Sequence, residues 1–271
     1  MKIQSALKVL LLALVLSLSG CQQVVGNIVG TAMQTTTQRV GEEIGNRVAS
    51  AVLGDLGPRM IRSYTIGLMH LLFYQGGYDA QLEDYQPGQY TVWQSETAEF
   101  GQIMERAFLR REENGNEWWR LEAYSQDPDT GEEFHLIMEG LFETRDDGSR
   151  LVRRLRVQYP DSDTPEEVPI TRENQEEWVV RTNQLTPESL EGMRVGQEEV
   201  TVPAGTFQTT HYKTDAQRYR GVESNWWVTD QQIPGRIVRV MHYDTAEREV
   251  AQEIELVQFG SDATESILGV F

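Results

Sequence analysis

The feature that most constrains the fold is a two-residue alternation of apolar and polar side chains that begins near Tyr85. Successive side chains of a strand point to opposite faces, so this period is typical of a sheet with one face in a core. Short turns between the alternating segments predict that neighbouring strands run antiparallel. We therefore expect residues 85–271 to form a mainly β domain, an antiparallel meander that makes an open half-barrel or curved sheet.

Three turn signals mark hairpins in this domain: Asn114-Gly115, Asp147-Gly148 and Pro203-Ala204-Gly205. Residues 170–182 fit either a short helix or a strand, and Thr186-Pro187 is typical of a helix start. A proline- and acid-rich loop is expected at residues 160–169. The expected strands are, in chain order, residues 89–94, 107–111, 118–124, 134–142, 151–159, 198–202, 206–213, 225–229, 236–243 and 249–259.

Residues 21–84 lack this alternation and are expected to form a helical tether. Apolar residues recur at helical spacing over residues 31–53, and a second helix is expected at residues 59–74. Small residues four apart, such as Gly41 and Gly45, would let the first helix approach another helix or a membrane closely. A loosely ordered glycine-rich tether is the alternative, because glycine disfavours helix formation.

The first 20 residues have the pattern of a cleavable export signal. Lys2 and Lys8 precede an apolar run, Val9–Leu16, and small residues follow it. The run is far shorter than the roughly 20 residues that a membrane-spanning helix needs. We therefore expect residues 1–20 to be removed after export.

The signal ends in Leu18-Ser19-Gly20-Cys21, and Cys21 is the only cysteine of the chain. This tetrapeptide resembles the lipobox of bacterial lipoproteins. The resemblance implies cleavage before Cys21, a diacylglycerol thioether on its sulfur and acylation of the new N-terminus, which together attach the mature chain to a membrane. Under the sorting rule of that family, Gln22 favours the outer membrane, facing the periplasm, over the inner membrane.

The chain is strongly acidic, with a formal charge of −18. Removal of the signal, which carries Lys2 and Lys8 and no acidic residue, leaves the mature chain at −20. Such a charge repels nucleic acid and anionic lipid surfaces, so no nucleic-acid partner is expected. The acidic residues are spread along the chain, which is typical of a solvated surface.

No catalytic or metal-binding motif is recognisable in the sequence. It lacks His-Glu-x-x-His, Cys-x-x-Cys, Gly-x-Ser-x-Gly and a phosphate-binding glycine loop. His242 and Asp244 lie two residues apart and could form a metal or acid/base cluster with His211, although solvated surface positions are the favoured interpretation. We therefore expect no enzymatic activity, no metal and no cofactor, and a hydrolase is the least favoured function class.

One basic stretch stands out in this acidic chain, with Arg150, Arg153, Arg154 and Arg156. On a strand, Arg154 and Arg156 share a face, and Leu155 points the other way. The two arginines could contact an anionic group or an acidic partner. A strand face paired with glutamates of neighbouring strands is the favoured interpretation.

Two pairs of adjacent tryptophans, Trp118-Trp119 and Trp226-Trp227, should each send one ring to either face of a strand. One ring of each pair is expected in the core, and the other is either covered or lines a cavity. We assign Trp226 and Trp227 as candidate ligand-binding residues. A ligand pocket predicts apolar neighbours and an opening to solvent around the second ring, whereas an interaction protein predicts a filled core.

Two hairpin motifs near the C-terminus resemble a known group of proteins. The first is Val-Thr-Val-Pro-Ala-Gly-Thr-Phe over Val200–Phe207, and the second joins Trp226–Asp230 to Ile233–Val238. Their order and spacing are similar to the DUF3108-like group of periplasmic proteins and, more remotely, to the lipoprotein carriers LolA and LolB. The resemblance covers residues 195–260 and implies an open β half-barrel whose concave face, capped by helices, holds lipid acyl chains. No functional residue carries over.

Two hypotheses of function follow. The leading one is a non-enzymatic cell-envelope lipoprotein whose β domain binds an apolar ligand, such as a lipid or acyl chain. The competing one is an envelope protein–protein interaction or assembly module without a ligand pocket. Both give the chain a membrane contact through lipidated Cys21.

Overall fold

The computed structural model describes most of the expected β domain. The chain divides into two compact units, residues 1–71 and 72–271, and every described residue belongs to the second. The expected signal, Cys21 and both expected N-terminal helices lie outside the described residues, except Tyr74, which lies in a strand. The structure describes residues 74–75, 78–79, 85–96, 101–126, 133–159, 162–180, 187–214 and 222–269.

One large antiparallel sheet dominates this part of the chain and confirms the expected mainly β fold. In the described residues the sheet has 12 strands. Each expected strand is present, most of them longer than the sequence pattern indicated. The strands are β3 (Tyr90–Glu96), β4 (Gly101–Arg111), β5 (Glu117–Gln126), β6 (Glu133–Thr144), β7 (Arg150–Gln158), β8 (Glu166–Glu167), β9 (Val179–Val180), β10 (Arg194–Val202), β11 (Gly205–Lys213), β12 (Val222–Thr229), β13 (Ile237–Asp244) and β14 (Glu249–Gly260).

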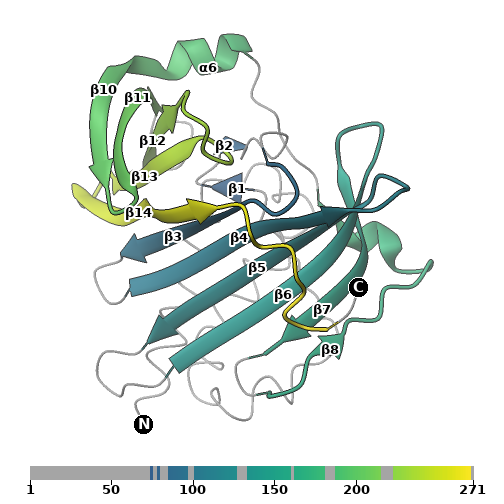
Figure 1. The fold of residues 1–271 in the computed structure, drawn as a ribbon. Helices are drawn as coiled ribbons and strands as arrows, with labels where there is room; N and C mark the ends of the chain where they lie inside the picture. The colour runs from purple at the N-terminus through teal and green to yellow at the C-terminus, as the bar shows by residue number, and fades with distance from the viewer. Residues whose placement is uncertain are drawn as a thin grey trace. The chain divides into compact units, whose positions relative to one another are not determined.

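The strand order shows that the first and last strands of the sheet in the chain pair with each other in the middle of the sheet. The sheet runs β10-β11-β12-β13-β14-β3-β4-β5-β6-β7-β8, with β9 also beside β7 (Figure 1). The last strand, β14, therefore pairs with the first strand of the sheet, β3, and Leu256 lies opposite Trp93. Within the described residues the sheet ends at β10 and β8, so it is open and not a closed barrel.

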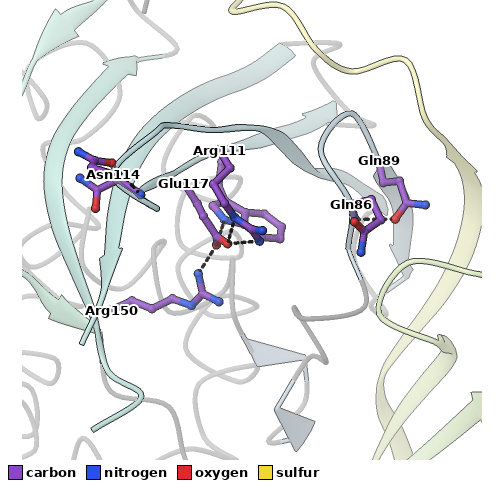
Figure 2. Close-up of polar contacts among 8 residues, drawn as sticks. Gln86, Gln89, Arg111, Asn114, Glu117 and Arg150 are labelled. Atoms are coloured by element: carbon purple, nitrogen blue, oxygen red, sulfur yellow. Dashed lines mark hydrogen bonds and ion pairs between the residues drawn. The ribbon is translucent and has the colours of Figure 1, made fainter. Parts of the chain in front are cut away.

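The predicted turns form where the sequence placed them. Gly115, Gly148 and Gly205 all have positive φ, at 89°, 79° and 142°. Glycine adopts these angles without the steric cost that other residues meet. In the first turn the Asn114 side chain also accepts a hydrogen bond from the Asn116 backbone N–H at 2.9 Å (Figure 2).

Several short elements differ from the expectation or resolve it. β8 lies inside the expected loop at residues 160–169, because β7 offers it a free edge. The ambiguous residues 170–182 contain both alternatives, a helix turn followed by a strand that also pairs with β7. Two short strands, β1 (Tyr74–Gln75) and β2 (Tyr78–Asp79), pair with each other within the expected tether. The helix turn is the 3-10 helix η2 (Gln175–Trp178). The α-helix α6 (Pro187–Met193) begins at the expected proline.

The sheet coils back on itself at the β10 end. The turn between β10 and β11 reaches β14, where the Ala204 backbone N–H donates to the Leu256 carbonyl oxygen at 3.1 Å. Register irregularities in the β12–β13, β13–β14 and β14–β3 pairs allow such bending. The result is an apolar cluster that includes Phe207, Trp226 and Ile254. None of the described helices has the length and apolar composition of a membrane span.

Candidate functional site

A charged row crosses the middle of β5, β6 and β7. Arg120 lies opposite Glu139, and Glu139 lies opposite Arg156. Glu139 is 1% exposed and Arg120 is 7% exposed, so two opposite charges are buried side by side. Burying a charge costs free energy unless it is paired and hydrogen-bonded. The groups that bind these buried charges therefore define the candidate site.

The C-terminal segment, residues 261–269, runs from β14 across this row (Figure 1). The Ile267 backbone N–H donates to Glu139 Oε1 at 2.6 Å, and the Ser266 hydroxyl donates to the same carboxylate. Leu268 is 5% exposed, whereas Ile267 is half exposed. The carboxylate thus binds an N–H of an irregular chain, and the next residue of that chain, Leu268, is buried.

The two arginines hold carbonyl oxygens of the same segment. Arg120 Nη1 donates to the Glu265 carbonyl oxygen at 3.1 Å, while its Nη2 donates to Glu105 Oε1 at 2.7 Å. Arg156 Nη1 donates to the Leu268 carbonyl oxygen at 3.2 Å. The face therefore binds residues 261–269 chiefly through backbone atoms.

The basic stretch on β7 forms ion pairs with glutamates, as the favoured interpretation predicted. Arg153 Nε donates to Glu143 Oε2 at 2.6 Å. Arg154 and Arg156 share a face and both bind Glu167 of β8, at 2.8 and 3.2 Å. The hydrogen bond from Arg154, followed by that from Arg156, holds the pKa of Glu167 below its ordinary value despite partial burial. Contact of Arg154 and Arg156 with an anionic group or a partner stays a prediction.

Glu117 is the centre of a second charged cluster, on the opposite face of β5 from Arg120. Arg150 Nη1 and Arg111 Nη2 converge on its two carboxylate oxygens at 2.7 and 2.8 Å (Figure 2). Trp119 Nε1 donates to the same group at 3.1 Å. Burial alone would raise the pKa of Glu117, but the bonds from Arg150, Arg111 and Trp119 outweigh it and lower the pKa. The ionised carboxylate is therefore a structural counter-ion.

Both rings of the first tryptophan pair are covered. Trp118 is 2% exposed; its Nε1 donates to Glu112 Oε1 at 3.1 Å, and the Arg154 guanidinium lies 5.4 Å from its ring centroid. Trp119 stacks on Phe108, with ring centroids 4.7 Å apart. The pair points to opposite faces, and neither ring is open to solvent.

The second pair is arranged in the same way. Both residues belong to the apolar cluster, where Trp226 is 1% exposed and Trp227 is 7% exposed. The Trp227 ring stacks on His211 at 4.6 Å between centroids, with the Arg239 guanidinium 5.2 Å from its ring centroid. Its Nε1 donates to Glu198 Oε1 at 2.7 Å. Polar side chains thus flank the second ring, which also packs within the apolar cluster, and ligand binding by Trp226 and Trp227 stays a prediction.

His242 is buried, and not at the solvated surface that we favoured from the sequence. It is 4% exposed because its side of β13 faces the core, and burial lowers its pKa to about 4. His211 lies opposite Trp227, whereas His242 lies opposite Ser224, so the two histidines are on different faces of the sheet. Asp244 ends β13 and accepts from the turn that follows. The metal or acid/base cluster of His211, His242 and Asp244 that the sequence allowed therefore does not form.

The described residues contain no group of three or more His, Cys, Asp or Glu side chains placed to hold a metal ion. Sequence reasoning missed Glu139 and Gln252, although a signal for each was present. Glu139 interrupts the apolar run from Leu136 to Phe142, and Gln252 occupies an apolar-face position two residues before Ile254. A polar residue at a core position of an alternating strand marks a buried hydrogen-bonding group.

No protein-family model and no curated protein matches the chain. Among solved structures it is similar to a chain of the MucA/MucB complex of Pseudomonas aeruginosa, with 11% identity and a TM-score of 0.36 over 68% of this chain and 55% of that one. It is also similar to a candidate lipoprotein of Parabacteroides distasonis, with 10% identity and a TM-score of 0.28 over 65% and 96%. It is likewise similar to a candidate exported protein with a YmcC-like fold from Bacteroides fragilis. This similarity has 11% identity and a TM-score of 0.28 over 65% of this chain and 97% of that one.

The chain thus spans about half the length of the MucA/MucB chain that it matches. Similarities with such low TM-scores carry no argument about function. The resemblance to DUF3108-like proteins and to LolA and LolB stays a prediction from the sequence.

Proposed function

We propose that the protein is a non-enzymatic lipoprotein of the cell envelope whose β domain is a protein-interaction module. Attachment through acylated Cys21 to the outer membrane, facing the periplasm, is supported by the lipobox and by Gln22. The interaction function is supported by the charged face of β5–β7, which binds an irregular chain segment that crosses the sheet.

The observation that carries the proposal is the buried Glu139 carboxylate bound to the Ile267 backbone N–H at 2.6 Å. Its partners belong to residues 261–269, a segment without regular secondary structure. A partner segment that offers one N–H, two carbonyl oxygens and a leucine side chain would make the same contacts. The covered second rings of both tryptophan pairs also favour an interaction protein over an open apolar pocket.

A peptide-binding experiment tests the interaction function. The mature chain, with Cys21→Ser and ending at Gly260, is titrated with a fluorescent peptide of residues 261–271. We expect saturable binding that Glu139→Gln weakens about tenfold or more, because a hydrogen bond to a charged group contributes roughly 1.5–3 kcal/mol. Glu143→Gln, on the same strand but paired with Arg153, is the matched control. A chain that is folded by circular dichroism and does not bind the peptide would contradict the proposal.

Labelling with radioactive palmitate tests the anchor. We expect the wild-type chain to incorporate label and to fractionate with membranes, because the lipobox directs acylation of Cys21. The Cys21→Ser chain should lose both properties. Label that persists in Cys21→Ser would refute lipidation at this residue.

A second candidate function, binding of a lipid or another apolar ligand, is favoured by a different observation. The face that carries Trp226 and Ile254 is apolar, yet it contains buried polar atoms without a hydrogen-bond partner, among them His242 Nε2 and Gln252 Oε1. These atoms are on the face of the sheet opposite Trp227.

A further inference from the structure

The C-terminal segment meets the charged row through side chains as well as backbone atoms. Ser266 donates its hydroxyl to Glu139 Oε2, while the Ile267 backbone N–H donates to Oε1 of the same carboxylate. Each oxygen of this buried group therefore has a donor from the segment. An alanine in place of Ser266 would leave Oε2 without the hydroxyl, and a buried acceptor that loses a donor weakens the contact. The face thus favours a hydroxyl side chain at this position.

The two residues that follow Ser266 differ in exposure. Ile267 is half exposed, whereas Leu268 is 5% exposed. Burial of an aliphatic side chain is a main source of binding free energy, so truncation of the leucine would remove such a source. Truncation of the exposed isoleucine would remove little. The face therefore selects leucine and tolerates other residues at the position before it.

Gly269 has a backbone conformation that other residues avoid. Its φ is 121°, and a Cβ atom at this position would lie 2.9 Å from Arg156 Nη1. The same nitrogen donates to the Leu268 carbonyl oxygen at 3.2 Å, so it cannot move away without loss of this hydrogen bond. Glycine meets neither obstacle, because it has no Cβ and adopts positive φ at little cost. The face therefore selects glycine directly after the leucine.

We propose that the charged row of Arg120, Glu139 and Arg156 recognises the sequence Ser-x-Leu-Gly in an irregular segment of a partner protein. The proposal rests on the interaction function proposed above and names the kind of partner. The bonds from Arg120 and Arg156 reach carbonyl oxygens, so they contribute affinity for a segment of any sequence. The serine, leucine and glycine supply the selectivity.

The chain carries its own copy of this sequence at residues 266–269 and holds it on the row. The segment is also fixed at its start, where the Ala263 backbone N–H donates to the Gly88 carbonyl oxygen at 3.0 Å. A binding segment that is attached to its own site has a high effective concentration there. A partner must therefore displace residues 266–269, and the C-terminal segment weakens the binding of every partner.

A separate partner fits this site better than the C-terminal segment of a second copy. The formal charge of −18 makes two copies of the chain repel each other. Within one copy the segment already reaches the row. Exchange of segments between copies would therefore replace contacts with identical ones and add repulsion.

The test measures the binding of fluorescent peptides to the mature chain, residues 21–271 with Cys21→Ser. The reference peptide has the sequence of residues 261–271. In the chain itself, Leu268→Ala and Gly269→Ala together weaken the attached copy and so free the row. We expect this chain to bind the reference peptide at least about tenfold more tightly than the chain with an unchanged C-terminal segment, because the attached copy no longer competes.

Single changes in the peptide test each position of the sequence. Leu268→Ala should weaken binding about tenfold or more, because buried aliphatic surface is lost. Ser266→Ala and Gly269→Ala should each weaken it about 3- to 10-fold, through a lost hydrogen bond and an unfavourable φ. Ser266→Thr keeps the hydroxyl and Ile267→Ala removes an exposed side chain, so both peptides should bind as the reference does.

A matched pair of protein variants identifies the group that binds the serine hydroxyl. In Glu139→Gln, the affinity ratio between the reference and the Ser266→Ala peptide should fall toward one, because the carboxylate that accepts the hydroxyl is gone. In Glu143→Gln, on the same strand, the ratio should stay unchanged, since Glu143 pairs with Arg153. Circular dichroism checks that each variant is folded, and the peptide series alone decides if Glu139→Gln is not.

The outcomes separate this inference from the function on which it rests. Binding of no peptide by the folded chain would overturn both. Equal binding of all the peptides would overturn the Ser-x-Leu-Gly sequence alone, and the site would then bind any irregular segment through its backbone. A dimer of the Cys21→Ser chain in size-exclusion chromatography that Gly269→Ala dissociates would also overturn the inference, because the occupant would be a second copy.

Discussion

The buried carboxylates of β5 and β6 differ from the buried polar side chains of β13 and β14 in how completely they are hydrogen-bonded. In β4–β7 each buried carboxylate has several donors: Glu117 is bound by Arg111, Arg150 and Trp119, and Glu139 by an N–H and a hydroxyl. In β13 and β14, the facing residues His242 and Gln252 each have one buried polar atom without a hydrogen-bond partner. The matched Glu139 carboxylate holds the C-terminal segment, and losing one partner of a matched charge would destabilise the fold, as an unmatched buried polar atom does.

This difference distinguishes two regions of the sheet by their chemistry. The row of Arg120, Glu139 and Arg156 is already occupied by residues 261–269, so any partner must compete with this segment. His242 and Gln252 lie in the core, and one polar atom of each has no hydrogen-bond partner. Three predictions test this comparison.

The largest effect is expected for Trp226→Ala, at about 3–5 kcal/mol of lost unfolding free energy, because the ring is 1% exposed in the apolar cluster. Trp227→Ala should cost less, about 1–3 kcal/mol, because His211 and Arg239 that flank its ring can be rehydrated. Urea unfolding of both variants measures the difference. Equal losses would show that the two faces of β12 contribute alike.

A pH-dependent loss of about 3 kcal/mol is expected from His242. Its folded-state pKa of about 4 is below its ordinary value of 6.5, so the unfolded chain binds the proton more readily. This stability is fully present above pH 6.5 and is lost as the pH falls toward 4, with about 2 kcal/mol lost by pH 5.

Chemical denaturation of the wild type and of His242→Leu between pH 7.5 and 5 measures this contribution. The variant should lack the His242 part of the slope, while His211→Leu should keep it. An identical pH dependence in the wild type and His242→Leu would contradict the buried, neutral state of this imidazole.

The smallest effect is expected from the ion pairs of Glu117 in β5. Glu117→Ala leaves Arg150 and Trp119 without their acceptor and should cost about 2–3 kcal/mol, less than a fully buried pair because Arg111 is half exposed. Arg154→Ala, which removes an exposed ion pair with Glu167, should cost under about 1 kcal/mol and is the control. A larger loss for Arg154→Ala than for Glu117→Ala, in thermal unfolding, would reverse this ranking.

Much of the fold could be predicted from the sequence because the signals are local. Alternation located the strands, and Gly115, Gly148 and Gly205 located turns that need positive φ. The strands are longer than predicted because pairing extends them beyond the apolar residues. The candidate site was predicted only in part: Arg156 was singled out as a possible partner contact, and Glu139 was not, although it is the more buried of the two.

The sequence by itself determined that adjacent tryptophans point to opposite faces, since successive side chains of a strand always alternate. Only the tertiary structure decided that Trp226 lies beside Val240 and Trp227 beside His211, because that choice depends on which strands pair and in which register. The β14–β3 join, the burial of His242 and the contact of Ile267 with Glu139 were likewise decided there. These contacts connect residues far apart in the chain. Their stability depends on the whole packed structure, so no local sequence pattern predicts them.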